Sequence, residues 1–149
     1  MYTTGNDGYT QRIIIYDLFC HEGLYKNDGH GSPLVILNCV KQFYTSQKDQ
    51  KKSSVRIDVC FNDKDAHKVE RLKENVKNLN LNLEGVGELI YSVGDYRVEV
   101  QKAIKLISEL KNGKVFLFID PYDYKHIKAD QIRALLKYKN AEVLLFLPT

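Results

Sequence analysis

The chain enters its first regular element with RIIIYDLF, the residues Arg12–Phe19, most of which are apolar or β-branched. A short apolar run closed by polar and glycine residues is typical of a strand buried on both faces. A polar loop follows over His21–Gly31. Ser32 and Pro33 then favour a helix start, with Ser32 as the N-cap and Pro33 at the first helical position. We expect this helix to reach about Ser46.

Strand-like and helix-like segments alternate along the rest of the chain. The spacing of Val69, Leu72 and Val76 predicts an amphipathic helix, and Asn112-Gly113 favours a left-handed stop for a later one. The expected strands are Ser54–Phe61, Glu88–Val93, Lys114–Ile119 and Ala141–Leu147; the expected helices between them are Asp65–Leu79, one between Asp95 and Asn112, and Ala129–Tyr138. This alternation predicts an α/β fold with a doubly wound, mainly parallel sheet and helices on both faces.

The composition favours one soluble domain. With 149 residues, 44% of them hydrophobic, the chain can bury one sizeable core. Its apolar runs are shorter than the roughly 18 to 20 residues that span a bilayer, and no secretory signal is visible, so we expect a cytoplasmic protein. The net charge of +3 is mildly basic, and we expect the basic cluster Lys48–Lys52 to be a solvated loop. Three widely spaced cysteines favour reduced thiols over a disulfide framework or a zinc site: Cys20, Cys39 and Cys60.

The first strand ends in DLFCHEG, the residues Asp17–Gly23. Ligands of such sheets bind outside the carboxyl ends of the strands, so these residues matter for function. The segment resembles the Asp-Leu-Phe-Ala-Gly-x-Gly motif of cytosine-5 DNA methyltransferases and of a bacterial and phage family, the three-Cys-motif partner proteins. The resemblance implies that Asp17, Phe19 and Gly23 contact a cofactor, although His21 stands where the motif has its central glycine. A capping Asp after a buried strand is the simpler alternative.

The second and third strands also end in acidic residues. In methyltransferase-like sheets, a carboxylate at the second strand end accepts hydrogen bonds from the ribose hydroxyls, and the resemblance gives this role to Asp63, with Asp65 capping the next helix. Asp95 follows the third strand, where methyltransferases commonly hold the adenine amino group. The alternatives are that Asp63 also caps the helix and that Asp95 lies in an ordinary turn.

The fourth strand runs into IDPYDYK, the residues Ile119–Lys125. This segment resembles the Asp-Pro-Pro-Tyr motif of amino-group methyltransferases, and more closely the Ile-Asp-Pro-Phe-Gly-Tyr-Lys segment of the three-Cys-motif partner family. By resemblance, Asp120 and Pro121 would orient an amino group, and Tyr122 would stack on a planar substrate. The alternative is a proline turn whose tyrosines cover the core.

The resemblance extends from about Ile13 to Pro148 and implies an S-adenosylmethionine-dependent methyltransferase fold. It further implies S-adenosylmethionine as cofactor, nucleic acid as a candidate methyl acceptor, and a separate three-Cys-motif protein as partner. The competing interpretation is a non-catalytic binding or assembly module with a degenerate cofactor site, for which His21 is the argument.

The four histidines show no metal-ligand spacing. We expect His67 on the surface, and His21 and His126 at the crevice.

Complete sheets of the methyltransferase type carry two further strands. We therefore expect this sequence to be a single methyltransferase-like domain truncated after Ala141–Leu147. Nothing in Val143–Leu147 blunts the edge of that last strand, which predicts self-association through it.

Overall fold

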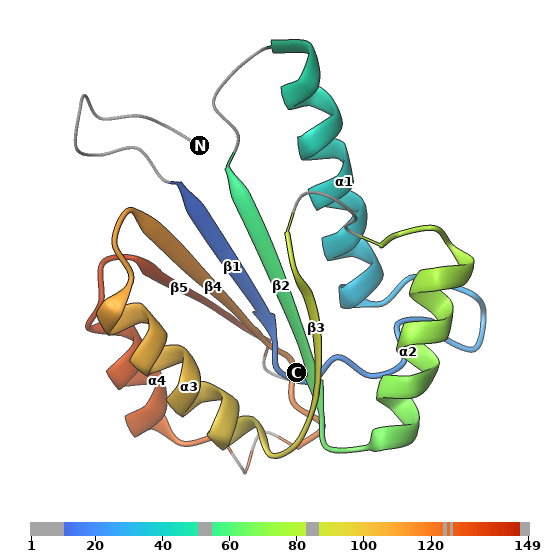
Figure 1. Cartoon of the computed structure of the whole chain (residues 1–149). Helices are drawn as coiled ribbons and strands as arrows, with labels where there is room; N and C mark the ends of the chain where they lie inside the picture. Colours follow the sequence, from blue (N-terminus) through green and yellow to red (C-terminus); the bar gives the residue numbers. More distant parts are fainter. Residues whose placement is uncertain (1–10, 51–54, 83–86, 124, 126, 147–149) are drawn as a thin grey trace.

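Five parallel strands form one sheet in the order β3-β2-β1-β4-β5. The computed structural model of the chain (Figure 1) describes residues 11–50, 55–82, 87–123, 125 and 127–146. The strands are β1 (Arg12–Asp17), β2 (Arg56–Asp63), β3 (Leu89–Val93), β4 (Gly113–Ile119) and β5 (Ala141–Leu145). Since β1 lies between β2 and β4, the strand order reverses at β1, where such sheets place their ligand crevice.

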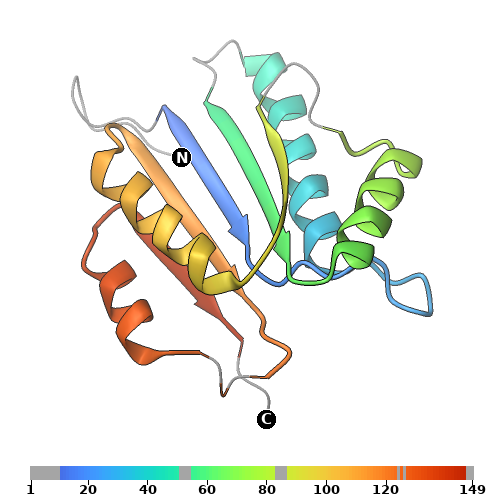
Figure 2. The ribbon, with the colours of Figure 1, turned by 60° about the horizontal axis from the view of Figure 1, so that its bottom comes forward.

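Four helices connect the strands. They are α1 (Ser32–Gln50), α2 (Ala66–Asn78), α3 (Tyr96–Glu109) and α4 (Ala129–Leu136). Helices α1 and α2 lie on one face of the sheet, and α3 and α4 lie on the other (Figure 2). The predicted parallel α/β architecture with helices on both faces is therefore confirmed, and the chain has a Rossmann-like fold.

Each face of the sheet has its own apolar cluster. Under α1 and α2, Phe61 of β2 packs with Leu34, Leu37, Val69 and Leu72. The cluster under α3 and α4 is made by side chains from four strands or their ends and both helices: Ile14, Tyr16, Leu18, Cys60, Tyr96, Val100, Ala103, Ile107, Val115, Leu117, Ile119, Leu135 and Ala141. Alternation along each strand sends neighbouring residues to opposite clusters.

Two expectations about α1 are wrong in detail. The helix continues to Gln50, so the part of the predicted basic loop before Lys51 is helical; Lys51 and Lys52 lie outside the described residues. Ser32 is the first helical residue rather than the N-cap, because the carbonyl of Gly31 accepts the first helical bond, from the N–H of Val35.

The other boundaries differ from the expected ones by at most three residues, as helix and strand ends usually do. The expected left-handed stop of α3 at Asn112-Gly113 is wrong, because the helix ends at Glu109 and its C-cap Leu110 has an extended backbone. Asn112, with φ +55°, lies in the bend that leads into β4. None of the helices in the described ranges is long and apolar enough to cross a membrane.

Candidate functional site

The loops after β1, β2 and β4 meet at the carboxyl edge of the sheet, at the lower ends of the strands in Figure 1. They bring Asp17, Asp63 and Asp120 close enough that the latter two raise the pKa of Asp17. Asp17 and Asp63 are buried, whereas Asp120 is exposed. Three of the four predicted strand-end carboxylates therefore share one electrostatic environment.

Asp17 is a buried carboxyl group with one oxygen unused. Its Oδ2 accepts a hydrogen bond from Ser32 Oγ at 2.6 Å, whereas no described residue donates to Oδ1. Burial raises the pKa of Asp17 to about 7, and the nearby Asp120 and Asp63 add to this effect. Hydrogen bonds from Ser32 and the Phe19 backbone act in the opposite direction. Asp17 can therefore be protonated near neutral pH and has capacity for a further hydrogen bond.

Asp63 ties three loops together. Its Oδ2 accepts hydrogen bonds from the His21 backbone N–H at 3.0 Å and from the Tyr122 hydroxyl at 2.7 Å. Its Oδ1 accepts from the Asp65 backbone N–H at 2.9 Å, while Asp65 caps α2 through the N–H of His67, as expected. Both oxygens of Asp63 are thus engaged within the protein.

Tyr122 lies over Asp63 and is held on several sides. Lys68 Nζ donates to its hydroxyl at 2.9 Å and also lies 4.3 Å from its ring centroid. The His21 ring is 4.3 Å away, and the Phe19 ring is 6.2 Å away, edge-on. Burial is the main cause that raises the pKa of Tyr122, and the hydrogen bond to Asp63 raises it further. The hydroxyl therefore remains a donor at neutral pH.

The glycine-like turn keeps its backbone shape although the central residue is histidine. His21 has φ +58°, in the left-handed region that glycine adopts most easily. Burial and, more weakly, Lys68 lower the pKa of His21, while Asp63 and Asp120 act in the opposite direction, so the ring is neutral at pH 7. Gly23 has φ +86°, and a Cβ there would lie 2.7 Å from Leu72 Cδ1. Helix packing therefore accounts for glycine at position 23.

Asp95 lies at a neighbouring cavity. It caps α3 by accepting from the Arg97 N–H at 2.8 Å, and it also pairs with the Arg97 guanidinium at 2.6 Å. The cavity has a volume of about 390 Å³ and is lined by Leu18, Phe19, Lys64, Gly94, Asp95, Tyr96 and Arg97. Pockets for small molecules are about 300–1,000 Å³ in volume, so this cavity can hold one.

A second, smaller cavity lies at the loop after β1. Its volume is about 160 Å³, and its lining includes His21, Gly23, Ser32 and Asp120. Pro121 is half-buried between Asp120 and Tyr122 in the chain. His126 lies outside the described residues, and His67 is exposed, as expected.

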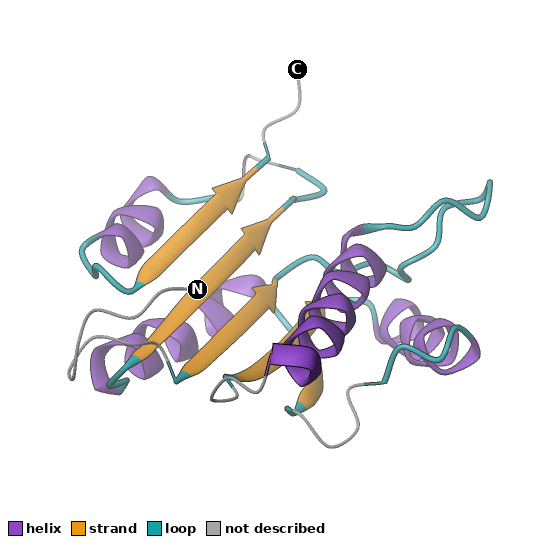
Figure 3. Cartoon of the chain, turned by 90° about the horizontal axis from the view of Figure 1, so that it is seen from above, coloured by secondary structure: helices purple, strands orange, loops and turns teal. Residues whose placement is uncertain are grey.

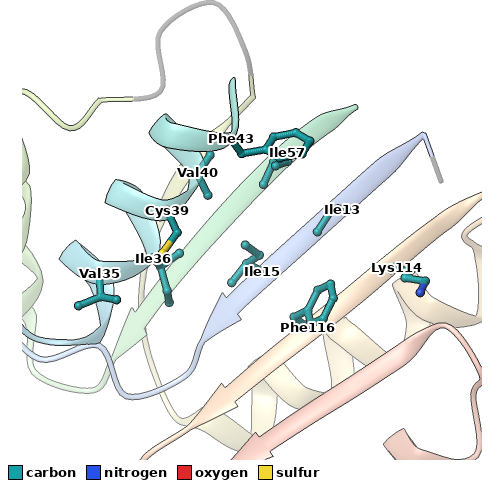
Figure 4. A pocket seen from close by; sticks show the side chains of 10 residues that line it. All are labelled: Ile13, Ile15, Val35, Ile36, Cys39, Val40, Phe43, Ile57, Lys114 and Phe116. Atoms are coloured by element: carbon teal, nitrogen blue, oxygen red, sulfur yellow. The ribbon is translucent and has the colours of Figure 1, made fainter. Parts of the chain in front are cut away.

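An apolar groove of about 460 Å³ opens elsewhere, between α1 and the strands β1, β2 and β4 (Figure 4). Its lining includes Ile15, Val35, Ile36, Phe43 and Phe116, and none of the predicted site residues. Apart from Cys39 and Lys114 the lining is apolar, and apolar side chains can hold a ligand but cannot orient or activate a reacting group. The candidate chemical site is therefore the polar crevice at the strand ends.

Sequence reasoning missed two members of this crevice. Ser32 was expected to cap a helix but donates to Asp17, and Lys68 on α2 was not singled out at all. The position of Lys68 in the sequence could have indicated that it belongs to the crevice, because it lies in the first turn of the helix that follows the acidic strand end. The side chains of His, Cys, Asp and Glu in the described part of the chain form no group of three or more that could hold a metal ion.

The fold and the cavities at its strand ends define a Rossmann-like α/β protein. Comparison with protein-family models, with curated proteins and with solved structures gives no match for this chain.

Proposed function

We propose that the chain binds the adenosyl part of S-adenosylmethionine at the carboxyl ends of β1, β2 and β3. The observation that carries this proposal is the cavity of about 390 Å³ beside the strand-order reversal, with Asp95 in its lining and Asp63 adjacent to Lys64 of the same lining. Phe19 and Tyr96, whose rings are 5.1 Å apart, supply aromatic surface for a purine.

The residues around this cavity fit an adenosine. Asp95 would accept a hydrogen bond from the adenine amino group, and Asp63 would accept from the ribose hydroxyls. A ligand can approach the backbone at Gly94, where a Cβ would have no neighbour within 4 Å.

The proposed reaction is methyl transfer, for which bound S-adenosylmethionine supplies an electrophilic methyl group. The chain contributes to the reaction by positioning the methyl acceptor rather than by supplying a strong base. Asp120 is exposed beside the smaller cavity and would orient an acceptor amino group, together with the carbonyl of Pro121. Nucleic acid as acceptor and a three-Cys-motif protein as partner rest on the sequence resemblance alone.

A non-catalytic binding or assembly module is the second candidate. It is favoured by one specific observation, namely that His21, Asp65 and Tyr122 already occupy both oxygens of Asp63. In this alternative, Asp63 holds three loops together and binds no ligand.

Calorimetric titration with S-adenosylmethionine and S-adenosylhomocysteine separates the two candidates. We expect saturable binding by the wild-type chain, weakened by about 1 to 3 kcal/mol in Asp63→Ala, the range for a lost hydrogen bond to a charged group. Asp120→Asn should still bind S-adenosylmethionine but should no longer transfer its methyl group to an acceptor. Asp130→Asn, a change at an exposed carboxylate on α4, is the matched control. Absence of binding to the folded wild-type chain would reject the methyltransferase and favour the module.

A further inference from the structure

Tyr122 contacts residues that line each of the two cavities of the crevice. It contacts Phe19 and lies 5.9 Å from the ammonium group of Lys64, both of which line the larger cavity. It also packs against His21, which lines the smaller one. Asp63 is not among the described residues that line either cavity. It is buried, and the Tyr122 hydroxyl is the side-chain donor on its Oδ2.

Tyr122 is held at Asp63 by polar contacts near the surface of the protein. Its hydroxyl lies between Asp63 and Lys68, and its side chain is 42% exposed. It lies outside both apolar clusters of the described residues. The ring can therefore leave Asp63 without opening a cavity in the core, at the cost of a few hydrogen-bonding and ring contacts.

We propose that Tyr122 is a latch that an adenosyl ligand must displace from Asp63. A ribose hydroxyl is the same kind of donor as the tyrosine hydroxyl, so one O–H···carboxylate bond replaces another. Displacement joins the two cavities and frees the aromatic ring to stack on a planar methyl acceptor. The proposal rests on the proposed function, and it implies that the cofactor binds before the acceptor.

The first test removes the latching hydroxyl and keeps the ring. Tyr122→Phe leaves Asp63 with one donor fewer in the free protein, so we expect S-adenosylhomocysteine to bind about tenfold more tightly in a calorimetric titration. Tyr138→Phe, which deletes a hydroxyl at the far end of α4, should leave the Kd unchanged. Equal or weaker binding by Tyr122→Phe, with the wild-type chain still binding, overturns the latch and leaves the proposed function standing.

The second test follows the ring itself. The chain contains no tryptophan, so Tyr122→Trp introduces a single reporter at the latch. We expect its emission to shift to longer wavelength as S-adenosylhomocysteine saturates the protein, because the indole leaves His21 and Asp63 for water. An unchanged spectrum at calorimetric saturation overturns the displacement. Calorimetric silence in the wild type and in both variants overturns the proposed function and the latch with it.

Discussion

The two faces of the sheet differ in how well helices cover them. Under α3 and α4, the β4 residues Val115, Leu117 and Ile119 are buried. On the other face, β4 and β5 extend beyond α1 and α2 (Figure 3). Leu117 is 1% exposed, whereas Leu144, on the β5 side without a helix, is 55% exposed. Within β4 itself, the buried residues Val115, Leu117 and Ile119 alternate with partly exposed residues that face the other side, among them Phe116 and Phe118.

The difference shows which face carries stability. Burial of apolar surface is the main favourable term in folding, so the closed face should contribute more for each side chain. The open face retains α1 through polar as well as apolar contacts, including the bond between Ser32 and the buried Asp17. Its exposed side chains are available for contacts with other molecules.

The largest effect should come from truncating neighbouring side chains of β4. Leu117→Ala should lower the free energy of unfolding by about 3 to 5 kcal/mol, as expected for a fully buried leucine. Phe116→Ala, on the half-open face, should lose about half of the roughly 3 to 5 kcal/mol typical of a buried phenylalanine. Denaturant unfolding of both variants measures the difference, and equal losses would show that the faces are equally packed.

The next effect is a pH dependence from Asp17 on the α1 side. Its pKa in the folded protein, about 7, lies above the ordinary value of 3.8. Protonated Asp17 therefore contributes stability that is complete below about pH 4 and lost as the pH rises through 7. Relative to Asp17→Asn, the wild type should lose about 2 to 4 kcal/mol between pH 4 and pH 8. The control Asp130→Asn, at an exposed site, should show no such pH-dependent difference from the wild type. If the difference in unfolding free energy between the wild type and Asp17→Asn does not vary with pH, the raised pKa of Asp17 is contradicted.

Substitution on the open edge should change stability little and association strongly. Leu144→Lys and Phe146→Lys remove exposed apolar side chains from β5 and its end, so the free energy of unfolding should stay within about 0.5 kcal/mol. We expect the wild type to self-associate at high concentration in light scattering and the double variant to be monomeric. If the wild type is monomeric at the same concentration, the β5 edge is not a self-association surface.

The reactivity of the cysteine thiols should show the same difference between exposed and buried sites, in a test that does not alter stability. Cys39 is exposed on α1 beside the apolar groove, whereas Cys20 and Cys60 are buried. Burial also raises the pKa of Cys60 to about 12 and that of Cys20 further, which suppresses their thiolate forms. A thiol reagent should therefore label one cysteine rapidly in the native protein, and Cys39→Ser should abolish that fast phase. Three equally fast thiols would contradict the burial of the other two.

Most of the architecture could be predicted from the sequence because apolar periodicity directly reflects burial. The strands β1 and β4 and the helix α2 appear where their patterns place them. The end of α1 could not be placed, because a run of polar residues such as Gln47–Gln50 reads equally well as a loop or as an exposed final turn.

The candidate site was predictable in position but not in its contacts. Parallel strands bring Asp17, Asp63 and Asp120 to one edge, which follows from topology. The hydrogen bond between Tyr122 and Asp63 joins residues far apart in sequence, and no local pattern encodes it. The sequence also did not show the backbone at position 21, where His21 adopts the left-handed conformation that glycine adopts most easily.

The central place of β1 has a consequence for the order of folding. One edge of β1 pairs with β2, which follows soon after it, but its other edge waits for β4, which begins at Gly113. During synthesis from the amino terminus, the β1-α1-β2-α2-β3 half can form while β1 still has an open edge. The β1–β4 pairing closes a much longer loop and should be the slower event. Tyr122 arrives with β4, so the crevice is completed only when the late half docks onto the early one.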